Sequence, residues 1–396
     1  MLNTSGGATF ELGDAAPLVD AASCASISER ATAEKRPVDI IFVIDNSGSM
    51  SEEIAAVEAR INDDFAGILS ASGADYRVIM ISKYGEKSPG SVANGPNDIC
   101  IRAPLGAGDC SGTQPKPTLN AAPRFYQQDV EIMSQDAWCK LIDNFAGSDG
   151  WGQYARPEAF KSIVIISDDE NECTTAAALA SSSDPVQLSA NPGAFVLKDP
   201  SANAARFDVT LRALSVEQFG TAERRKYRVH SIVGVVGNTT DEGAWPPSAP
   251  LQAAECGSDV DAAGEAHQAL SILTGGLRFP ICAHDNFNVV FRALAADALQ
   301  AAQLSCEWKI PPPPSGEAFD PGLVNLEYHA GGGATVTTIP KVNTLGDCRA
   351  SGGWYYDQDP NPSRVLACPA TCQTLEADSS GAINLAFGCS TIVDVR

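Results

Sequence analysis

The chain contains a short apolar run that ends abruptly in polar residues. Ile40 to Ile44 are five consecutive apolar residues, and Asp45-Asn46-Ser47-Gly48-Ser49 follow at once. A continuous apolar run is typical of a fully buried strand rather than a half-exposed one. A helical pattern begins near Met50, so the carboxylate and hydroxyls stand on a loop between strand and helix. In open α/β sheets, ligands bind beside such loops, at the carboxyl ends of the strands.

The same arrangement occurs a second time. Ser162 to Ser167 is apolar in its centre, and it leads directly into Asp168-Asp169-Glu170-Asn171-Glu172. The sequence therefore predicts two buried strands that each carry acidic side chains at the carboxyl end.

The regions between and after these runs alternate between strand and helix patterns. An alternation of this kind predicts a doubly wound, mostly parallel α/β sheet. Two segments interrupt it as long insertions, 85–125 and 174–205. We expect strands at Tyr76–Ser82, Tyr126–Met133, Tyr227–Val236 and Leu277–Ile281, and helices at Met50–Ser72, Ser134–Phe145, Phe207–Phe219, 263–274 and Phe287–Leu304.

The character of the chain changes at Cys306. Pro311 to Pro314 form a stiff spacer, and strand and turn patterns follow. We expect a small β-sandwich stapled by disulfides. Cys368 and Cys372 are each expected to pair elsewhere, with Cys348 and Cys389 as the nearest candidates, and other connectivities remain open. The expected strands are Leu323–His329, Ala334–Ile339, Gly353–Asp357, Val365–Cys368 and Ile383–Phe387.

Charge and cysteine content limit the possible functions. The net charge of −22 argues against nucleic acid, whose phosphates require a basic surface. Twelve cysteines are spread along the chain without a CxxC pair, and Cys100 and Cys110 are expected to close a small loop. Disulfides are therefore favoured over metal-binding cysteines, and the protein is expected to be exported. No apolar run approaches the roughly 20 residues of a membrane-spanning helix. Residues 1–30 do not read as a signal peptide, so we expect a signal that has been removed, with lipid anchoring left open.

Asp45, Ser47 and Ser49 provide oxygen donors at alternate positions, which suit a hard cation such as Mg²⁺. This Asp-x-Ser-x-Ser pattern resembles the metal-ion-dependent adhesion site (MIDAS) of von Willebrand factor A domains. The resemblance implies a second ligand at Asp168, where Ser167-Asp168-Asp169 replaces the usual Thr-Asp-Gly. It also implies a third ligand at the start of the preceding helix, for which Ser134 is the candidate and Thr118 the alternative. Mg²⁺ is expected, with Ca²⁺ or Mn²⁺ as alternatives, and the vacant metal position would take a carboxylate from a partner.

Several of these residues have a simpler explanation. Ser49 and Glu52 match a helix capping box, so Ser49 could only cap the helix. Glu52 and Glu53 occupy positions where integrin domains bind an adjacent metal, but acidic residues also favour a first helical turn. Asp169, Glu170 and Glu172 could hold a second cation or form a solvated acidic loop. His230, within an apolar strand, is expected to be a satisfied core histidine.

The resemblance covers about residues 37–305, between an N-terminal arm and edge segment (1–36) and the β-rich region (306–396). The segment Gly352 to Cys389 also resembles the tail of secreted or lipid-anchored A-domain proteins of myxobacteria and related Gram-negative bacteria, some of which are surface adhesins, including one used in gliding motility. These resemblances imply a cell-surface or outer-membrane adhesin that binds a protein or substratum through the metal. The alternatives are an assembly component that recruits envelope or motility proteins, or a metal-dependent hydrolase using Asp45, Asp168 and Asp169. No nucleophile elbow or phosphate loop occurs, so we expect no enzyme activity.

Overall fold

Strand β1 (Val38–Ile44) is buried along its whole length in the computed structural model. Its even-numbered residues pack into one apolar cluster and Ile41 and Val43 into another. Because successive side chains of a strand point to opposite faces, an unbroken apolar run needs cover on both sides. The sequence of β1 therefore requires a position in the middle of a sheet that is covered on both faces.

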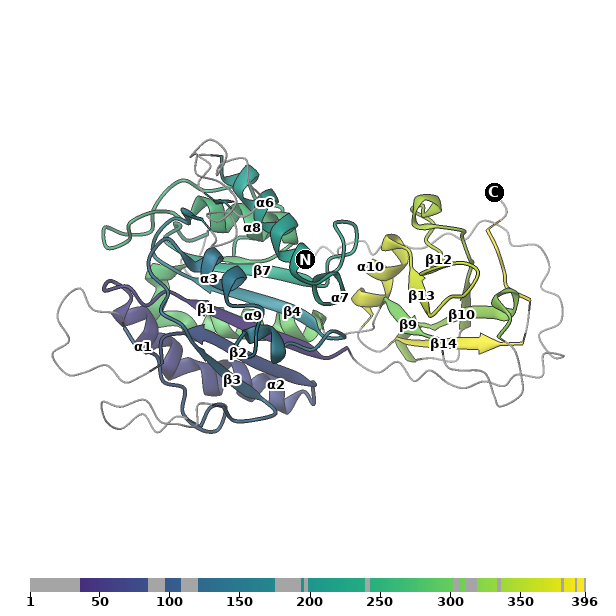
Figure 1. Cartoon of the computed structure of the whole chain (residues 1–396), viewed down its shortest axis with the longest axis horizontal. Coiled ribbons are helices and arrows are strands. Elements are labelled where there is room, and N and C mark those ends of the chain that lie inside the picture. The colour runs from purple at the N-terminus through teal and green to yellow at the C-terminus, as the bar shows by residue number, and fades with distance from the viewer. Residues whose placement is uncertain are drawn as a thin grey trace, which may run out of the picture. The chain divides into compact units, whose positions relative to one another are not determined.

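β1 lies within a sheet of six strands whose pairs are all parallel, which confirms the expected doubly wound α/β fold. The order is β3-β2-β1-β4-β7-β8, so the direction of winding reverses between β1 and β4 (Figure 1). The other strands are β2 (Tyr76–Ser82), β3 (Phe125–Asp129), β4 (Phe160–Ile166), β7 (Tyr227–Val233) and β8 (Arg278–Pro280).

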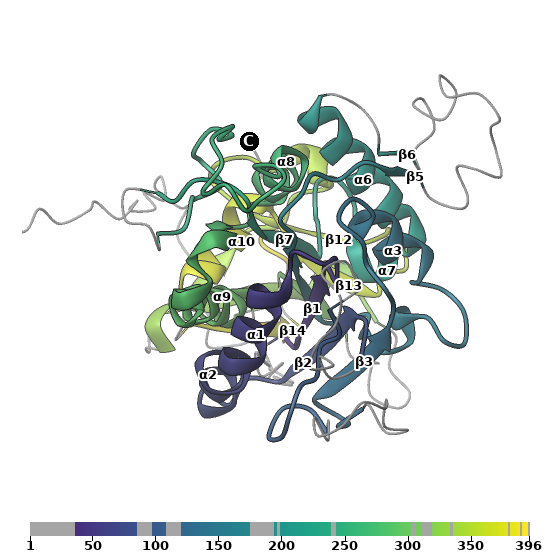
Figure 2. The same ribbon diagram turned by 90° about the vertical axis from the view of Figure 1, so that its left-hand side faces the viewer.

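Helices cover both faces of this sheet (Figure 2). One face carries α1 (Ser51–Arg60), a π-helical segment (Ile61–Ala66), α2 (Gly67–Ala71) and α9 (Phe287–Ala301). The other carries α3 (Ala137–Asp143), α6 (Pro200–Leu214), α7 (Val216–Phe219) and α8 (Glu265–Thr274). Short 3₁₀ turns lie at Trp151–Gln153 and Ile281–Asn286.

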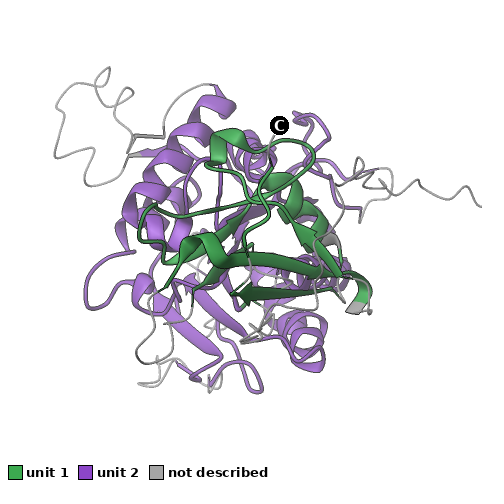
Figure 3. Cartoon of the chain, turned by 90° about the vertical axis from the view of Figure 1, so that its right-hand side faces the viewer, with its two compact units in different colours: residues 1–36, 303–396 green, residues 37–302 purple. Residues whose placement is uncertain are grey.

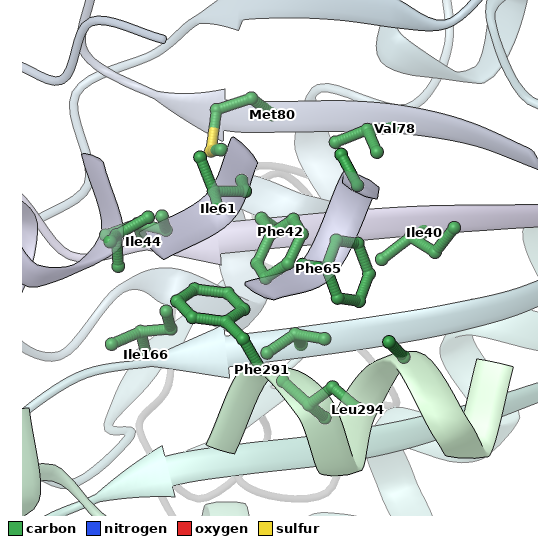
Figure 4. Close-up of a cluster of buried hydrophobic side chains, with 14 of the residues drawn as sticks. Ile40, Phe42, Ile44, Ile61, Phe65, Val78, Met80, Ile166, Phe291 and Leu294 are labelled. Atoms are coloured by element: carbon green, nitrogen blue, oxygen red, sulfur yellow. The ribbon is translucent and has the colours of Figure 1, made fainter. Parts of the chain in front are cut away.

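The first of these faces has an aromatic centre (Figure 4). Phe42 of β1 meets Phe65 of the π-helical segment at a ring separation of 5.4 Å and Phe291 of α9 at 5.9 Å. Such offset and edge-to-face pairs add to the stabilisation that burial of the rings already gives. This contact packs the π-helical segment and α9 against the strand that precedes Asp45.

Some element boundaries differ from the sequence expectations. The helix expected from Phe207 begins at Pro200, because the Asp199 side chain caps it by accepting hydrogen bonds from two main-chain amides. The end of the expected insertion 174–205 therefore belongs to α6. A small antiparallel pair, β5 (Cys173–Thr174) and β6 (Ala194–Phe195), precedes α6 in the chain. The strand expected to reach Met133 ends at Asp129.

The C-terminal region forms two antiparallel sheets that share one apolar core. One sheet has the order β11-β10-β14 and the other β12-β13-β9. Helix α10 (Pro369–Ala377), which the strand and turn pattern did not predict, adds Leu375 to this core. The strands are β9 (Glu307–Lys309), β10 (Val324–His329), β11 (Val336–Ile339), β12 (Trp354–Tyr356), β13 (Arg364–Ala367) and β14 (Ala382–Phe387), with 3₁₀ turns at Pro321–Leu323, Ala330–Gly332 and Leu345–Asp347.

Four disulfides join described residues: Cys139–Cys173, Cys256–Cys282, Cys306–Cys372 and Cys348–Cys368. The expected partnership of Cys368 with Cys348 is confirmed. The other suggestion is wrong, because Cys372 pairs with Cys306 and not with Cys389. Cys100 is also disulfide-bonded, but Cys110 lies outside the described residues. Disulfides in this number fit a protein that folds in an oxidising compartment.

The chain divides into two compact units (Figure 3). Unit 2 spans Pro37–Ala302 and holds the parallel sheet, and unit 1 comprises Met1–Arg36 and Gln303–Arg396. Among the described helices, none is both long enough and apolar enough to cross a membrane. The structure describes residues 36–84, 97–107, 120–174, 194–195, 199–238, 243–301, 306–310, 319–332, 336–378, 381–388 and 390–394.

Candidate metal centre

The candidate site lies where β1 and β4 end side by side. These two strands pair in parallel up to Ile44 and Ile166, and the winding of the sheet reverses between them. At such a reversal the connecting helices leave to opposite faces, which opens a crevice at the carboxyl ends of the strands. Asp45 and Asp168 follow the two strands directly, so the fold brings together the two acidic positions that the sequence separates.

Asp45 is a fully buried carboxylate. Its Oδ1 accepts a hydrogen bond from the main-chain amide of Ser47 at 2.7 Å, and its Oδ2 accepts one from the hydroxyl of Ser167 at 2.9 Å. Burial is the main reason that the pKa of Asp45 is raised to about 7. The hydrogen bonds from Ser47 and Ser167 lower this pKa, and the neighbouring charge of Asp168 raises it. No Lys, Arg or His of the described chain forms an ion pair with Asp45. The charge of Asp45 is therefore offset by hydrogen bonds rather than by a described basic side chain.

Ser47 and Ser49 place their hydroxyls beside these carboxylates. The two Oγ atoms lie 3.3 Å apart, and Ser49 forms a side-chain hydrogen bond with Asp168. The alternative role of Ser49 as a helix cap is wrong, because Met50 occupies the cap position of α1 and no side chain caps it. Ser49 therefore faces the second acidic loop.

Asp168 carries a buried carboxylate oxygen that is not hydrogen-bonded. The residue is only 2% exposed, and its Oδ1 has no hydrogen-bond partner among the described residues. Burial raises the pKa of Asp168, the hydrogen bond with Ser49 opposes this, and Asp261 and Asp169 raise it further. A buried carboxylate oxygen without a partner is costly, so it usually marks a bound group or a strained site.

The main chain of Asp168 is held by the loop between β7 and α8. Its carbonyl oxygen accepts hydrogen bonds from the amides of Asp261 and Ala262, at 2.9 and 3.2 Å. This loop can approach because Gly234 has no side chain, since a Cβ there would lie 2.0 Å from the Ala262 carbonyl oxygen. The loop that follows β7 therefore holds Asp168 in position, in addition to strand β4, which Asp168 follows.

Ser134 reaches the same place through its main chain. Its carbonyl oxygen lies 3.3 Å from the hydroxyl of Ser167, which in turn bonds Asp45. Ser134 stands in the turn before α3, because the helix begins at Ala137 rather than at Ser134. Thr118, the alternative third ligand, lies outside the described residues. Ser167 itself is an orienting residue that the sequence patterns did not single out.

Two asparagines hold the first loop in position. The Asn46 side-chain oxygen accepts hydrogen bonds from the Ser82 hydroxyl and the Lys83 amide, at 3.1 and 2.8 Å. Asn97 donates from its side-chain nitrogen to the carbonyl oxygen of Ser47, at 2.6 Å, and from its main-chain nitrogen to that of Asn46. Asn97 belongs to the insertion between β2 and β3, where no periodic pattern could have indicated this role.

A disulfide fastens the loops that carry Ser134 and Asp168. Cys139 and Cys173 each stand five residues after one of these positions, and they are bonded to each other. Main-chain and side-chain bonds reinforce the link, since Glu172 N–H donates to Gln135 C=O and Trp138 N–H to the Asn171 side chain. The two loops therefore form one connected structure.

Some of the other acidic residues have structural contacts. Glu170 caps α8, where its carboxylate accepts hydrogen bonds from the amides of Glu265 and Ala266. Glu52 and Glu53 lie in the first turn of α1, and Glu52 lies 3.3 Å from His284. Within the described ranges, no group of three or more His, Cys, Asp or Glu side chains is placed to hold a metal. A second cation site at Asp169, Glu170 and Glu172 gains no support.

His230 has the expected character of a core histidine. It is fully buried, its Nδ1 accepts the Leu277 amide at 3.0 Å, and its Nε2 lies 3.2 Å from Asp297 Oδ2. It lies within β7 and takes no part in the contacts of the candidate site.

The donor set fits a hard divalent cation. Two carboxylates would balance its charge, and neutral hydroxyls can complete part of its oxygen shell. Asp45, Ser47, Ser49 and Asp168 would hold the ion, and the half-buried Ser134 is linked to Asp45 through the hydroxyl of Ser167. Comparison of the chain with protein-family models and with curated proteins found no match.

Proposed function

We propose that unit 2 is a von Willebrand factor A-type domain and that the protein is a cation-dependent adhesin. Mg²⁺ is the proposed ion, with Ca²⁺ and Mn²⁺ as alternatives, held by Asp45, Ser47, Ser49 and Asp168 with Ser134 as a further donor. The observation that carries the proposal is the unpartnered Oδ1 of Asp168, buried beside an equally buried Asp45 at the reversal of the sheet.

The chemistry of the donors supports a binding role. Hydroxyl ligands donate little charge, so an ion held by two carboxylates keeps an affinity for a further oxygen ligand. A carboxylate of a partner protein or substratum would supply that ligand. In this proposal Asp45 and Asp168 balance the charge of the ion, Ser47 and Ser49 complete its shell, and Ser167 orients Asp45.

We further propose that the protein acts outside the cytoplasm, at the cell surface or outer membrane. The disulfides support an oxidising compartment, and the finer location rests on the resemblance of residues 352–389. Envelope assembly is the alternative role for the same metal site.

Isothermal titration with MgCl₂ tests the site, comparing native protein with Asp45→Asn and with Asp149→Asn. Asn keeps the shape of the buried residue, and the exposed Asp149 lies outside the site and serves as the matched control. Native protein and the control should bind Mg²⁺, and Asp45→Asn should lose at least about tenfold in affinity. Equal heats for native protein and Asp45→Asn would remove the site. Attachment assays with the same variants separate adhesion from assembly, because an assembly role would leave attachment unchanged.

A further inference from the structure

Arg278 is a fully buried arginine whose guanidinium binds main-chain oxygens instead of a carboxylate. It begins strand β8, and its Nη2 donates to the carbonyl oxygens of Pro246 and Ala249, at 2.8 and 2.9 Å. Its Nη1 donates to the carbonyl oxygen of Pro250, at 3.1 Å. Among the described residues, no Asp or Glu forms an ion pair with Arg278. Because a buried cation is costly, the three carbonyl dipoles compensate its charge in place of a carboxylate.

The bound oxygens belong to one turn of the β7–α8 loop, whose described part spans residues 234–238 and 243–264. The Ala249 amide closes this turn on the Pro246 carbonyl oxygen, at 3.0 Å. Trp245 fastens the same segment to the main chain of Arg278 through two hydrogen bonds, at 2.8 and 3.2 Å. The side chain and the backbone of Arg278 therefore hold residues 245–250 together.

Gln268 of α8 extends these contacts along the loop. It is fully buried, and its Oε1 accepts hydrogen bonds from Arg278 Nη1, at 3.3 Å, and from the Gln252 amide, at 3.1 Å. Its Nε2 donates to the carbonyl oxygens of Gln252 and Ala263, both at 2.8 Å. Both polar atoms of the Gln268 side chain thus bind the loop or Arg278. We call Arg278 and Gln268 the loop hub.

The loop hub is connected to the candidate metal centre through Ala263. The two residues before it, Asp261 and Ala262, donate their amides to the carbonyl oxygen of Asp168, at 2.9 and 3.2 Å. Ala263 is only 6% exposed, so its carbonyl oxygen depends on Gln268 for a hydrogen bond. A path of hydrogen bonds and one short chain segment therefore joins the loop hub to Asp168.

We propose that Arg278 and Gln268 are positioning residues of the metal centre, which order the β7–α8 loop so that its amides hold Asp168 where it ligates the cation. The inference rests on the proposed metal site and adds two residues that lie outside the loops of its ligands. The buried charge favours a single arrangement of the loop, because the loss of any carbonyl partner would leave the guanidinium less compensated.

Stabilisation of the fold alone is the competing explanation. Gln268→Glu separates the two roles, because glutamate keeps an oxygen for Arg278 but replaces the donor to Ala263 with a second oxygen. The connection to the metal centre is then cut, while Arg278 gains an ion pair. Arg278→Met removes the hydrogen bonds to the turn, and Arg278→Lys keeps the charge and part of the donors.

Hydrogen–deuterium exchange of the metal-free full chain is the first arm of the test. Gln268→Glu and Arg278→Met should speed the exchange of the Asp261 and Ala262 amides at least about tenfold relative to native protein, because the loop that presents them opens more often. This readout needs no bound metal. Gln268→Glu adds an ion pair, so it keeps the test independent of a folding failure of Arg278→Met.

Two matched controls replace side chains that bind main-chain oxygens elsewhere. Gln153 donates to the carbonyl oxygens of Ser148 and Gly150, so Gln153→Glu makes the same chemical change as Gln268→Glu. Arg77 donates to two main-chain oxygens near the start of β2, and Arg77→Met is the control for Arg278→Met. Both controls should leave the exchange of residues 261 and 262 as in native protein.

Isothermal titration with MgCl₂ is the second arm. Gln268→Glu and Arg278→Met should lose about tenfold in Mg²⁺ affinity, because residues that orient metal ligands typically contribute at least that much. Arg278→Lys should recover part of the loss, and both controls should bind like native protein. Unchanged Mg²⁺ affinity or unchanged amide exchange in the folded hub variants would overturn the inference alone. Absence of Mg²⁺ binding by native protein would overturn the proposed function and this inference with it.

Discussion

The side-chain amide of Asn97 donates a hydrogen bond of 2.6 Å to the main-chain oxygen of Ser47, fifty residues earlier in the chain. Asn97 is 6% exposed, and its main-chain amide also bonds the carbonyl oxygen of Asn46. The bonds hold the loop that presents Asp45, Ser47 and Ser49, so a residue of the insertion supports the proposed metal site without contacting the ion.

Replacing Asn97 by Ala should lower Mg²⁺ affinity about tenfold, because residues that orient metal ligands typically contribute tenfold to a hundredfold. Isothermal titration measures the affinity, and thermal unfolding without metal separates positioning from stability. Asn144→Ala is the matched control, since the Asn144 side chain also donates to a main-chain oxygen, that of Lys140, but not to the loop that carries Asp45, Ser47 and Ser49. A loss of stability with unchanged Mg²⁺ affinity would contradict the positioning role.

Asp45→Asn should stabilise the metal-free protein while it abolishes Mg²⁺ binding. The substitution removes a buried negative charge that has no basic partner in the described chain, and it keeps an oxygen to accept the Ser47 amide. We expect a gain of about 1–2 kcal/mol in the free energy of unfolding, measured in urea with a chelator present. In excess Mg²⁺ the native protein should become more stable than Asp45→Asn, because only native protein gains stability from binding the ion. Lower stability of the variant in chelator would show that the charge is already compensated.

Removing the Cys139–Cys173 disulfide should weaken both folding and metal binding. A double Ser variant loses a cross-link between residues 34 apart, which corresponds to about 3–4 kcal/mol of stability in the chain-entropy description. It should also lose about tenfold in Mg²⁺ affinity, since the loops of Ser134 and Asp168 are no longer fastened. The Cys348→Ser, Cys368→Ser variant in unit 1 is the control, and its unit 2 should bind Mg²⁺ like native protein. Unchanged affinity in the first variant would limit this disulfide to stability.

Asp208 should make stability depend on acid pH. Burial alone would raise the pKa of Asp208, but hydrogen bonds from Arg225, Arg212 and Tyr227 outweigh it and lower the pKa to about 2. The unfolded value is about 4, so the stabilisation is complete above pH 4 and is lost as pH falls through about 2. It amounts to about 2 kcal/mol for this nearly buried side chain.

Urea unfolding at several pH values from 7 to 2 measures this dependence. Compared with native protein, Asp208→Asn should be less stable at pH 7, and the difference should shrink towards pH 2. Asp149→Asn, at an exposed position, should follow the native curve. A constant difference at all pH values would assign the effect to lost hydrogen bonding alone.

The sequence contained enough information for the sheet because its strands are local apolar runs. β1 and β4 each read as buried segments, and their carboxyl ends could be placed at one edge from the α/β pattern alone. The expectation that Asp45 and Asp168 share one site came from the resemblance to von Willebrand factor A domains. Local signals also explain some misses: Asp199-Pro200 marks the true start of α6, and Cys368-Pro369 has Pro at the first turn of α10.

Other features depend on contacts between distant segments, which no local pattern encodes. Asn97 lies among Gly, Pro and Asn residues that predict only a loop. Glu170 reads as one acid among several, yet it caps a helix that starts 95 residues later. The Cys306–Cys372 bond joins residues 66 apart, and cysteine spacing alone carries no such pairing.

The hydrogen bond between Ser167 and Asp45 joins residues 122 positions apart. The two side chains meet only after β1 and β4 have paired in register and the intervening hundred residues have folded around them. A chain with a slipped strand or an exchanged disulfide would lack the complete set of oxygen donors. If the proposed site binds Mg²⁺, the Mg²⁺ affinity of a refolded preparation would report the fraction of molecules with the native topology.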